Sequence, residues 1–310
     1  MDLVFLGTPQ FAVPTLEALI AAGHNVKAVY TQPDRPSGRG QELAQSAVKK
    51  AALVHELQVL QPERIRHPEE IAKLAEFKVP AMVVVGYGQI LPQAIIDLAP
   101  LGIINVHGSL LPKYRGAAPI QWAIANGEKR TGVTTMRINA GMDTGDMLLK
   151  AELDILPGDT SPTLAERLSA LGARLLLETL PGLEAGAILS EPQDHAAATY
   201  APILKKEDGG IDFKRTAQQI VDRLRGFTPW PGASTSFRDS QWKILSANAP
   251  ESKSEGIPGQ IHASGKHLLI SCGMHTILDV TELQQEGRKR ITADAFLNGQ
   301  RPMENEVFGG

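Results

Sequence analysis

Cysteine is almost absent from this chain, and its absence removes whole classes of site. Cys272 is the single cysteine among 310 residues, so neither an internal disulfide nor a multi-cysteine zinc site can form. The eight histidines are scattered along the sequence without a spacing typical of metal ligands. We therefore expect no metal, and a reducing compartment, the cytoplasm, as the location.

Long apolar runs and an excess of charge of one sign are missing as well. The longest apolar stretches are far shorter than the roughly 20 residues that a helix needs to cross a bilayer. The N-terminal MDLVFLGTP has neither the basic region of a secretory signal nor the arginines of a transit peptide, and we expect no membrane association. The formal net charge of −3 argues against indiscriminate nucleic-acid binding and leaves only local basic patches for that role.

A glycine-rich nucleotide-binding turn is also lacking, although the first 150 residues have the pattern of a doubly wound α/β domain. The first turn, LGTPQF, carries Gly7 alone, so a dinucleotide has no glycine-lined cradle. Apolar strands alternating with amphipathic helices predict a mostly parallel sheet. Ligands bind such sheets beyond the carboxyl ends of the strands. The strands are expected at residues 3–6, 26–30, 81–85, 103–107 and 133–138, and the first helix at 12–22.

The second half of the chain changes its pattern. A long helix is expected over residues 160–184 and a shorter one over 216–226, with a polar, proline-containing stretch between them. Five short segments follow, and their spacing predicts a small antiparallel barrel. They lie at residues 233–237, 242–246, 259–262, 266–271 and 276–281. We expect a catalytic domain over residues 1–189, a linker over 190–206 and a barrel domain over 207–310.

Two polar side chains interrupt the apolar strand at residues 103–107, just where it ends. Asn105 and His107 are two residues apart, so they share one face of the strand. The next strand runs into NAGMDTGD, and we expect Asp143 of this loop to contact His107. An amide, an imidazole and a carboxylate suit attack on a carbonyl, because they offer donors for an oxyanion and groups that move a proton. No serine or cysteine nucleophile has a base at a suitable spacing, which favours direct transfer without an acyl-enzyme.

Longer motifs extend this interpretation. The sequence resembles the methionyl-tRNA formyltransferases, within the formyltransferase family that uses 10-formyltetrahydrofolate. HGSLLP together with MDTGD is specific for that family, whereas PDRPSGRG and the C-terminal barrel are typical of its tRNA-acting members. The resemblance implies a Rossmann-like formyltransferase domain and an OB-like barrel. It is carried by FLGTPQFAVPTLEAL, TQPDRPSGRG, VVVGYGQILP, INVHGSLLPKYRGAAPIQWAI, TGVTTMRINAGMDTGDML and FTPWPGASTSF, which cover nearly the whole chain.

The resemblance also implies roles for individual residues. Asn105, His107 and Asp143 would be catalytic, and the α-amine of methionine on initiator tRNA would attack the formyl carbon. The folate donor would bind three loops. Their residues are Ser109, Leu110, Leu111 and Pro112 in the first, Tyr87, Gly88, Gln89, Ile90 and Leu91 in the second, and Thr144, Gly145 and Asp146 in the third.

The tRNA contacts implied by the resemblance lie on the loop PDRPSGRG, where Arg35 and Arg39 are the candidates. The barrel domain is not basic overall, but short clusters of lysine and arginine there suit an RNA backbone. They lie at residues 205–206, 214–215, 223–225 and 288–290. We expect a monomer, and Lys113, Tyr114 and Arg115 receive no role.

Other functions stay open. An enzyme that formylates an amino sugar nucleotide is the main alternative, because such relatives share HGSLLPKYRG and a similar second domain, although they would not need the PDRPSGRG loop. A glycinamide ribonucleotide formyltransferase would lack the C-terminal domain. An RNA-binding protein without catalysis would tolerate the loss of Asn105, His107 or Asp143, yet all three are present.

Overall fold

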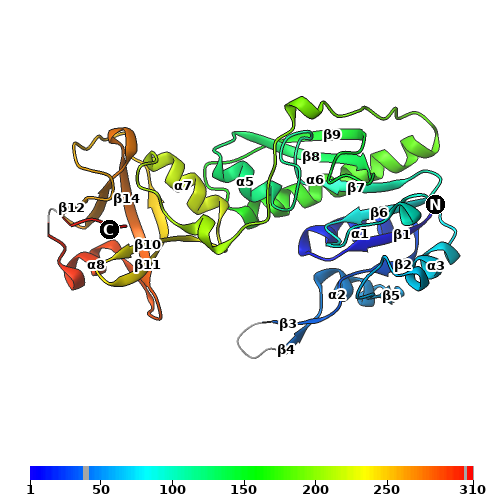
Figure 1. The fold of residues 1–310 in the computed structure, drawn as a ribbon, viewed down its shortest axis with the longest axis horizontal. Helices are drawn as coiled ribbons and strands as arrows, with labels where there is room; N and C mark the ends of the chain where they lie inside the picture. Colours follow the sequence, from blue (N-terminus) through cyan, green and yellow to red (C-terminus); the bar gives the residue numbers. More distant parts are fainter. Residues whose placement is uncertain (38–41, 304–305, 310) are drawn as a thin grey trace. The chain divides into compact units, whose positions relative to one another are not determined.

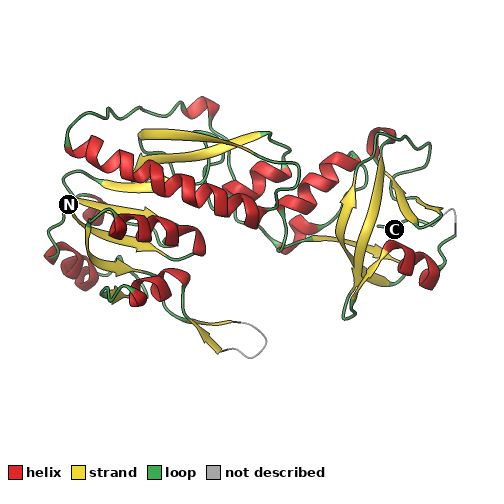
Figure 2. Cartoon of the chain, turned by 180° about the vertical axis from the view of Figure 1, so that it is seen from behind, coloured by secondary structure: helices red, strands yellow, loops and turns green. Residues whose placement is uncertain are grey.

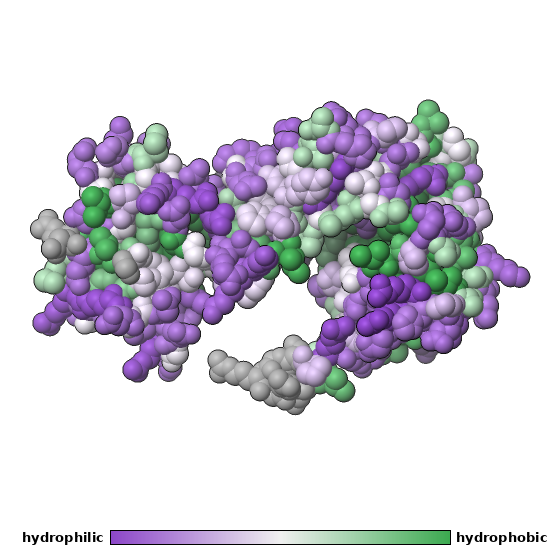
Figure 3. Space-filling view, viewed as in Figure 1, coloured by the Kyte–Doolittle hydropathy of each residue, from purple (hydrophilic) through white to green (hydrophobic). Residues whose placement is uncertain are grey.

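The chain forms two compact units (Figure 1), and the computed structural model describes residues 1–37, 42–303 and 306–309. The first unit comprises residues 1–119, 130–154 and 165–202, and the second comprises residues 120–129, 155–164 and 203–310. Hydrophilic residues, purple in Figure 3, cover most of the visible surface of both units. No helix of the described residues is both long and apolar enough to cross a membrane.

A seven-stranded sheet is the centre of the first unit. The strand order is β5-β2-β1-β6-β7-β8-β9, and the first five strands in this order are parallel. The last two, β8 and β9, each run antiparallel to the preceding strand. The mostly parallel fold class is therefore confirmed. The strands are β1 (Asp2–Gly7), β2 (Asn25–Tyr30), β5 (Val59–Leu60), β6 (Ala81–Val85), β7 (Ile103–His107), β8 (Arg130–Arg137) and β9 (Met147–Asp154).

Helices cover both faces of this sheet. On one face, Ile103 of β7 belongs to a core cluster with Leu74 of α3 and Ile95 of α4. On the other face, a Cβ atom at Gly172 of α6 would come within 2.7 Å of Val106. In Figure 2, α6 is the long helix beside the sheet. The helices of the chain are α1 (Val13–Ala21), α2 (Ala47–Val54), α3 (Pro68–Glu76), α4 (Gln93–Ile96), α5 (Pro119–Ala125), α6 (Ser161–Glu184), α7 (Ala217–Gly226) and α8 (Ala293–Gln300).

A two-stranded hairpin follows β2. It consists of β3 (Arg35–Ser37) and β4 (Glu42–Ala44), which pair in antiparallel register from Arg35 with Ala44 to Ser37 with Glu42. Residues 35–37 of PDRPSGRG therefore form a strand, which the proline- and glycine-rich composition of this sequence conceals. Residues 38–41, and with them the candidate Arg39, lie outside the described residues.

An antiparallel sheet forms the second unit. Its order is β10-β11-β14-β13-β12, with β15 paired to β14. The core beneath it contains Phe237, Trp242 and Phe296. The indole of Trp242 lies edge-on to the ring of Phe296, with 5.0 Å between the ring centres. The strands are β10 (Ala233–Phe237), β11 (Ser240–Asn248), β12 (Ile261–Ser264), β13 (His267–Ser271), β14 (Ile277–Gln285) and β15 (Arg290–Thr292).

The ends of this sheet are linked by a non-strand segment. Among the described residues β10 and β12 do not pair with each other, so the strands alone leave the expected barrel open. Residues 306–309 lie in the gap, where the Ile261 N–H donates to Glu306 O at 2.9 Å and the Gly309 N–H donates to Ser236 O at 2.8 Å. The C-terminal segment therefore completes the barrel without forming a strand of its own.

Two segments from earlier in the chain belong to this second unit. Trp122 of α5 lies edge-on to Phe227 with 5.3 Å between ring centres, and Arg225 Nη1 donates to Asp159 O at 2.9 Å. A Cβ atom at Gly226 would come within 2.7 Å of Gln121 O, so α5 and α7 require the small residue to approach this closely. Residues 120–129 and 155–164, expected in the catalytic domain, belong to the second unit instead.

Candidate active site

Asn105 and His107 share the face of β7 that α3 and α4 cover at Ile103. This follows from the alternation of side chains along the strand, because Val106 faces α6 on the opposite side. Asn105 is 9% exposed and His107 is 6% exposed. No hydrogen bond joins the Asn105 amide to another side chain or backbone group of the described residues, so this nearly buried amide is available to a ligand.

A backbone carbonyl fixes the orientation of the His107 ring. His107 Nε2 lies 2.9 Å from Tyr114 O, and because a carbonyl oxygen only accepts, Nε2 carries a proton. The other ring nitrogen, Nδ1, faces the carboxylate of Asp143 with 3.7 Å between Nδ1 and Oδ2. This distance is longer than a hydrogen bond, but it is short enough for the carboxylate to stabilise a protonated ring. The expected contact between His107 and Asp143 is present.

Asp143 reaches His107 by a route that the sequence does not reveal. Because β8 is antiparallel to β7, Arg137 at its carboxyl end pairs with Ile104 and not with His107. The loop of residues 138–146 therefore turns back toward the end of β7. The Gly116 N–H donates to Asp143 Oδ2 at 2.8 Å. The φ angle of Asp143 is 51°, a conformation uncommon for non-glycine residues that the surroundings must support.

Gln193 supplies part of that support, from the segment expected to be a linker. Its Nε2 donates to Asp143 O at 2.9 Å and to Gly145 O at 2.7 Å. Its Oε1 accepts from Arg115 Nε at 2.9 Å and from Arg115 Nη2 at 2.6 Å. Sequence reasoning missed Gln193, because a polar residue in a proline-containing stretch carries no periodic signal. Arg115 lies within the motif INVHGSLLPKYRGAAPIQWAI, but no pattern in the sequence indicates what it does.

The loop of residues 109–112 is held by hydrogen bonds to the following residue and to Thr134 of β8. Ser109 is fully buried and donates to Lys113 O, just after the loop. Thr134 Oγ1 donates to Ser109 O at 2.8 Å and accepts from the Leu111 N–H at 3.1 Å, and the Leu111 side chain is buried. Leu110 and Pro112 are half-buried. The last two side chains are therefore the ones in this loop that remain available to a ligand.

The loop after β6 likewise contains both structural and available residues. The side chains of Tyr87 and Leu91 are buried in the core beneath α3 and α4. Gln89 binds backbone groups of the loop after β5 through both ends of its amide. Gly88 and Ile90 are exposed, and Ile90 is 88% exposed. Tyr87 can contribute to a site only through its backbone, since its ring does not reach the surface.

The third candidate loop continues from Asp143. Thr144 Oγ1 donates to Asn139 Oδ1 at 2.9 Å, Gly145 is buried, and Asp146 is half-buried. The Arg137 N–H donates to Asp146 O at 2.9 Å. These contacts shape the loop that carries Asp143, and they leave the Asp146 side chain partly accessible.

A polar network holds the base of the β3–β4 hairpin. Asp34, directly before the exposed Arg35, accepts from Lys49 Nζ at 2.5 Å and from Gln61 Nε2 at 2.8 Å. Lys49 lies in α2, after the hairpin, and also donates to Gln61 Oε1 at 2.7 Å. Lys49 first and Gln61 second hold the pKa of Asp34 below its usual value. The two ends of the hairpin are thus joined to the sheet through one carboxylate.

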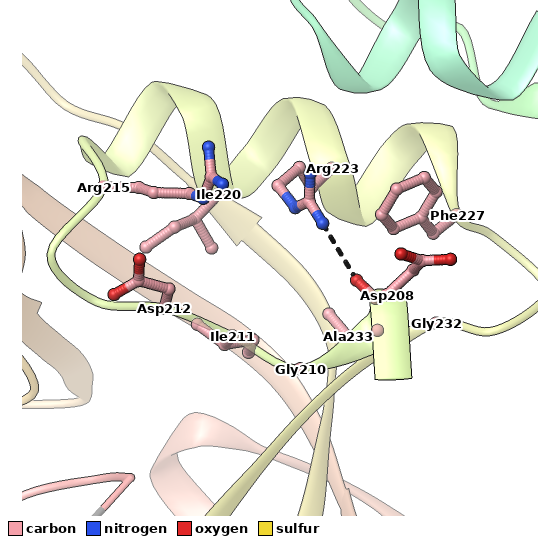
Figure 4. Close-up of a pocket in the computed structure, with 11 residues that line it drawn as sticks. Asp208, Gly210, Ile211, Asp212, Arg215, Ile220, Arg223, Phe227, Gly232 and Ala233 are labelled. Carbon is pink, nitrogen blue, oxygen red and sulfur yellow. Dashed lines mark hydrogen bonds between the residues drawn. The ribbon is translucent and has the colours of Figure 1, made fainter. Parts of the chain in front are cut away.

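A small cavity in the second unit is not a ligand site. It lies between α7 and the residues before β10, and Figure 4 shows Arg223 reaching across it to Asp208. Arg223 Nη2 donates to Asp208 O at 3.0 Å, and its guanidinium lies 4.8 Å from the ring centre of Phe227. The cavity measures about 10 Å³, which is room for no more than one water. In residues 1–37, 42–303 and 306–309 no group of three metal-ligating side chains is placed to hold an ion.

Sequence comparisons identify relatives over the whole chain. The formyl transferase family matches residues 1–180, and the formyl transferase C-terminal domain matches residues 203–301. The methionyl-tRNA formyltransferase of Koribacter versatilis is 59% identical over 310 residues, which cover 100% of this chain and 99% of that protein. The methionyl-tRNA formyltransferase of Solibacter usitatus is 58% identical over 309 residues, with the same coverage.

Solved structures share the fold at low identity. The N-formyltransferase of Helicobacter canadensis, in complex with folinic acid and dTDP-3-aminofucose, has a TM-score of 0.66 at 19% identity, over 90% of this chain and 98% of that chain. HypX of Aquifex aeolicus in complex with tetrahydrofolic acid has a TM-score of 0.62 at 17% identity, over 99% of this chain and 50% of HypX. The two-domain family match and the full-length relatives together show that this chain belongs to the formyl transferase family, among the methionyl-tRNA formyltransferases.

Proposed function

We propose that the protein transfers a formyl group from 10-formyltetrahydrofolate to the α-amine of methionine on initiator tRNA, by direct attack, for translation initiation. The observation that carries the chemistry is the meeting of the unpartnered Asn105 amide, the oriented His107 ring and the Asp143 carboxylate at the end of β7. The full-length relatives named methionyl-tRNA formyltransferase support the choice of acceptor.

The first task of the site is to remove a proton. The α-amine has a pKa of roughly 7.7 to 8.0, so at neutral pH most of it is protonated and cannot attack. In neutral His107 the unprotonated nitrogen is Nδ1, because Nε2 donates to Tyr114 O. Nδ1 therefore receives the proton, directly or through a water, and Asp143 Oδ2 at 3.7 Å balances the new charge.

The second task is to stabilise negative charge on the formyl oxygen. When the amine attacks, the formyl carbon becomes tetrahedral and its oxygen becomes an oxyanion. The Asn105 amide donates to that oxygen, and the protonated Nδ1 of His107 adds a second donor. Loss of one such donor typically costs about 3 kcal/mol of transition-state stabilisation. Collapse of the intermediate expels the folate nitrogen, which takes up the proton held by His107, and the attacking nitrogen releases its remaining extra proton to water.

The donor would lie among the three loops already described. Bound 10-formyltetrahydrofolate supplies the activated formyl group. Leu110 and Pro112 offer apolar contacts on one side, and Gly88 with the exposed Ile90 offers them on the other. Ser109, Tyr87 and Leu111 contribute backbone groups, since their side chains are buried. Thr144, Gly145 and Asp146 complete the set from the third loop.

This assignment gives each part of the chain a role. The first unit, which ends at residue 202, would carry catalysis, and the second unit would bind tRNA through its basic clusters. We place the protein in the cytoplasm as a monomer. A gel-filtration mass near 33.3 kDa is the expected result for the oligomeric state.

One assay tests the function. The purified protein is incubated with 10-formyltetrahydrofolate and, in parallel, methionyl initiator tRNA, elongator methionyl-tRNA and an amino sugar nucleotide. We expect formylation of the initiator species. Formylation of the sugar alone would replace this proposal by the amino sugar alternative.

Substitution of the donors tests the mechanism. We expect Asn105→Ala and His107→Ala each to lower kcat by roughly 100-fold or more, with little change in folate affinity, because these groups act on developing charge. Steady-state kinetics and folate titration measure the two quantities separately. Near-normal turnover in either variant would contradict the assignment.

Substitution on the hairpin tests tRNA binding. We expect Arg35→Ala and Arg39→Ala to raise KM for methionyl-tRNA and to weaken its dependence on salt, because each removes a cation that can meet a phosphate. Folate KM should stay unchanged. A tRNA KM equal to that of the parent protein at every salt concentration would refute the role of these arginines.

A further inference from the structure

Arg115 is a buried cation with neutral partners. It is 2% exposed and is among the largest fully buried side chains of the chain. Among the described residues its guanidinium binds the Gln193 amide oxygen, through Nε and Nη2, and the His195 Nδ1 atom at 3.1 Å from Nη2. A buried charge without a carboxylate is costly to keep, so its arrangement calls for an explanation beyond packing.

The guanidinium sets the orientation of the Gln193 amide. The oxygen and nitrogen of a glutamine amide can exchange places by a rotation, and their environment decides between the two. A guanidinium only donates, so the Gln193 oxygen must face Arg115. The Gln193 NH₂ group then points the other way, where it donates to Asp143 O and Gly145 O.

The result is that Asp143 is held from two sides. Gln193 binds its backbone carbonyl, and the Gly116 N–H, next to Arg115 in the chain, binds its carboxylate. The same backbone is anchored to the segment after Gln193, since the Arg115 N–H donates to Thr199 O at 2.8 Å and the Ala201 N–H donates to Arg115 O at 2.7 Å. Part of the stretch expected to be a linker is therefore built into the site.

We propose that Arg115 and Gln193 are positioning residues, which act through Asp143 by holding its strained loop and its carboxylate at the distance that His107 requires. The inference rests on the proposed function. It assigns a role to Arg115 and to the segment around Gln193.

Gln193→Glu is the decisive variant. The carboxylate still pairs with Arg115, so the protein should fold, but it cannot donate to the two carbonyls of the Asp143 loop. A displacement of a catalytic group by about 1 Å can cost roughly 100-fold in rate. We therefore expect kcat to fall by about that factor, with KM for methionyl-tRNA unchanged. Gln58→Glu, the same change at an exposed glutamine of the first unit, is the matched control and should leave kcat unaltered.

A double-substitution cycle separates positioning from general damage. If Gln193 acts through Asp143, then Gln193→Glu should have almost no further effect on kcat in an Asp143→Asn background. An equal loss of kcat in both backgrounds would overturn the proposal, as would wild-type kcat in Gln193→Glu itself. Arg115→Lys, which keeps the charge but loses the forked donors, should show an intermediate kcat.

Hydrogen exchange gives a readout that does not depend on turnover. The Gly116 N–H donates to the Asp143 carboxylate, so its protection reports where that carboxylate lies. We expect faster exchange at Gly116 and over residues 141–146 in Gln193→Glu and not in Gln58→Glu. Unchanged exchange at both places would refute the positioning role. This readout does not require activity: a parent protein that formylated none of the tested acceptors would count against the proposed function and not against the positioning role.

Discussion

The imidazole of His107 is oriented by a backbone carbonyl, and this has a chemical consequence. A carbonyl cannot be removed by substituting a side chain, so the tautomer of His107 depends on the path of the chain at Tyr114. That path is unusual, because Tyr114 has a φ of 59°, in the left-handed region where side chains are strained. The proton transfer proposed for His107 would therefore depend on the backbone of this loop and not on a second carboxylate.

Glu306 offers a pH-dependent test at the residue scale. Its carboxylate accepts from Arg238 Nε at 2.7 Å and Nη2 at 2.8 Å and from the Met303 N–H at 2.7 Å, and these contacts, Arg238 first, lower its pKa to about 2. The ionised Glu306 carboxylate stabilises the fold at pH values above the pKa of about 4.5 that it has in the unfolded chain. This stabilisation is lost as the pH falls toward 2. Urea unfolding should therefore show Glu306→Gln less stable than the parent at pH 7, with the difference closing as pH falls through that range.

The matched control for this test is Glu282→Gln, whose partially exposed carboxylate lies 3.9 Å from Arg290. This variant should differ little from the parent at any pH. If the stability difference between Glu306→Gln and the parent stayed constant down to pH 2, the charge of Glu306 would not be what stabilises the C-terminal segment.

Residue-level prediction from the sequence worked where a local rule applied. Asn105 and His107 could be paired because alternation along a strand places them on one face, and the contact of Asp143 with His107 is present. The same rule could not show that Ser109, Tyr87 and Leu111 turn their side chains inward, because burial in a loop depends on tertiary packing. Gln193 could not be found, since its partners lie about fifty or more positions earlier in the chain.

At the scale of elements, the β3–β4 hairpin has an ion pair between Lys49 and Asp34 at its base. The side chains of Lys49 and Asp34 are 16% and 24% exposed, so the pair is better shielded from solvent than a surface pair. We expect Lys49→Met to loosen the hairpin and to raise KM for methionyl-tRNA several-fold with kcat nearly unchanged, as steady-state kinetics can measure.

Lys73→Met is the control for the hairpin test. Lys73 pairs with Glu70 at 2.7 Å but is 55% exposed and lies in α3, away from the hairpin base. Its removal should leave the tRNA KM unchanged. Equal effects of the two substitutions would mean that the ion pair at the hairpin base has no special part in tRNA binding.

Elements were predicted well in kind and poorly in direction. The periodicity of apolar residues identifies five strands of the first sheet and five of the second, yet it carries no information about whether a neighbour is parallel, so the antiparallel direction of β8 was not foreseen. The eight-residue strand β9 was not predicted. The short strands β5 and β15 and the hairpin strands were missed because two or three residues are too few for a period.

At the scale of the whole molecule, the two units are not consecutive in the sequence. Prediction from composition places one boundary near residue 190, whereas residues 120–129 and 155–164 pack with residues 203–310. Such an arrangement leaves no signal in the local sequence, because the apolar side chains of α5 can be buried against either unit.

Truncation tests this arrangement. A chain that ends at residue 202 should unfold at a lower temperature than the full protein, because α5 loses Phe227 and the segment near Asp159 loses Arg225. Trp122 is the sole tryptophan of residues 1–202, so its fluorescence should shift to the red in the fragment. If the fragment melted at the same temperature as the full protein and its Trp122 emission did not shift to the red, the packing of α5 against Phe227 would be contradicted.

The interleaving of the two units also sets an order of events on the ribosome. Residues 120–129 are synthesised well before Phe227, so α5 emerges without the aromatic surface that it covers in the finished protein. The barrel in turn stays open until residues 306–309 have been made, since they join β12 to β10. The second unit therefore completes its fold only after residues 306–309 have been synthesised, while the sheet of the first unit, whose last segment stops at residue 202, can form before then.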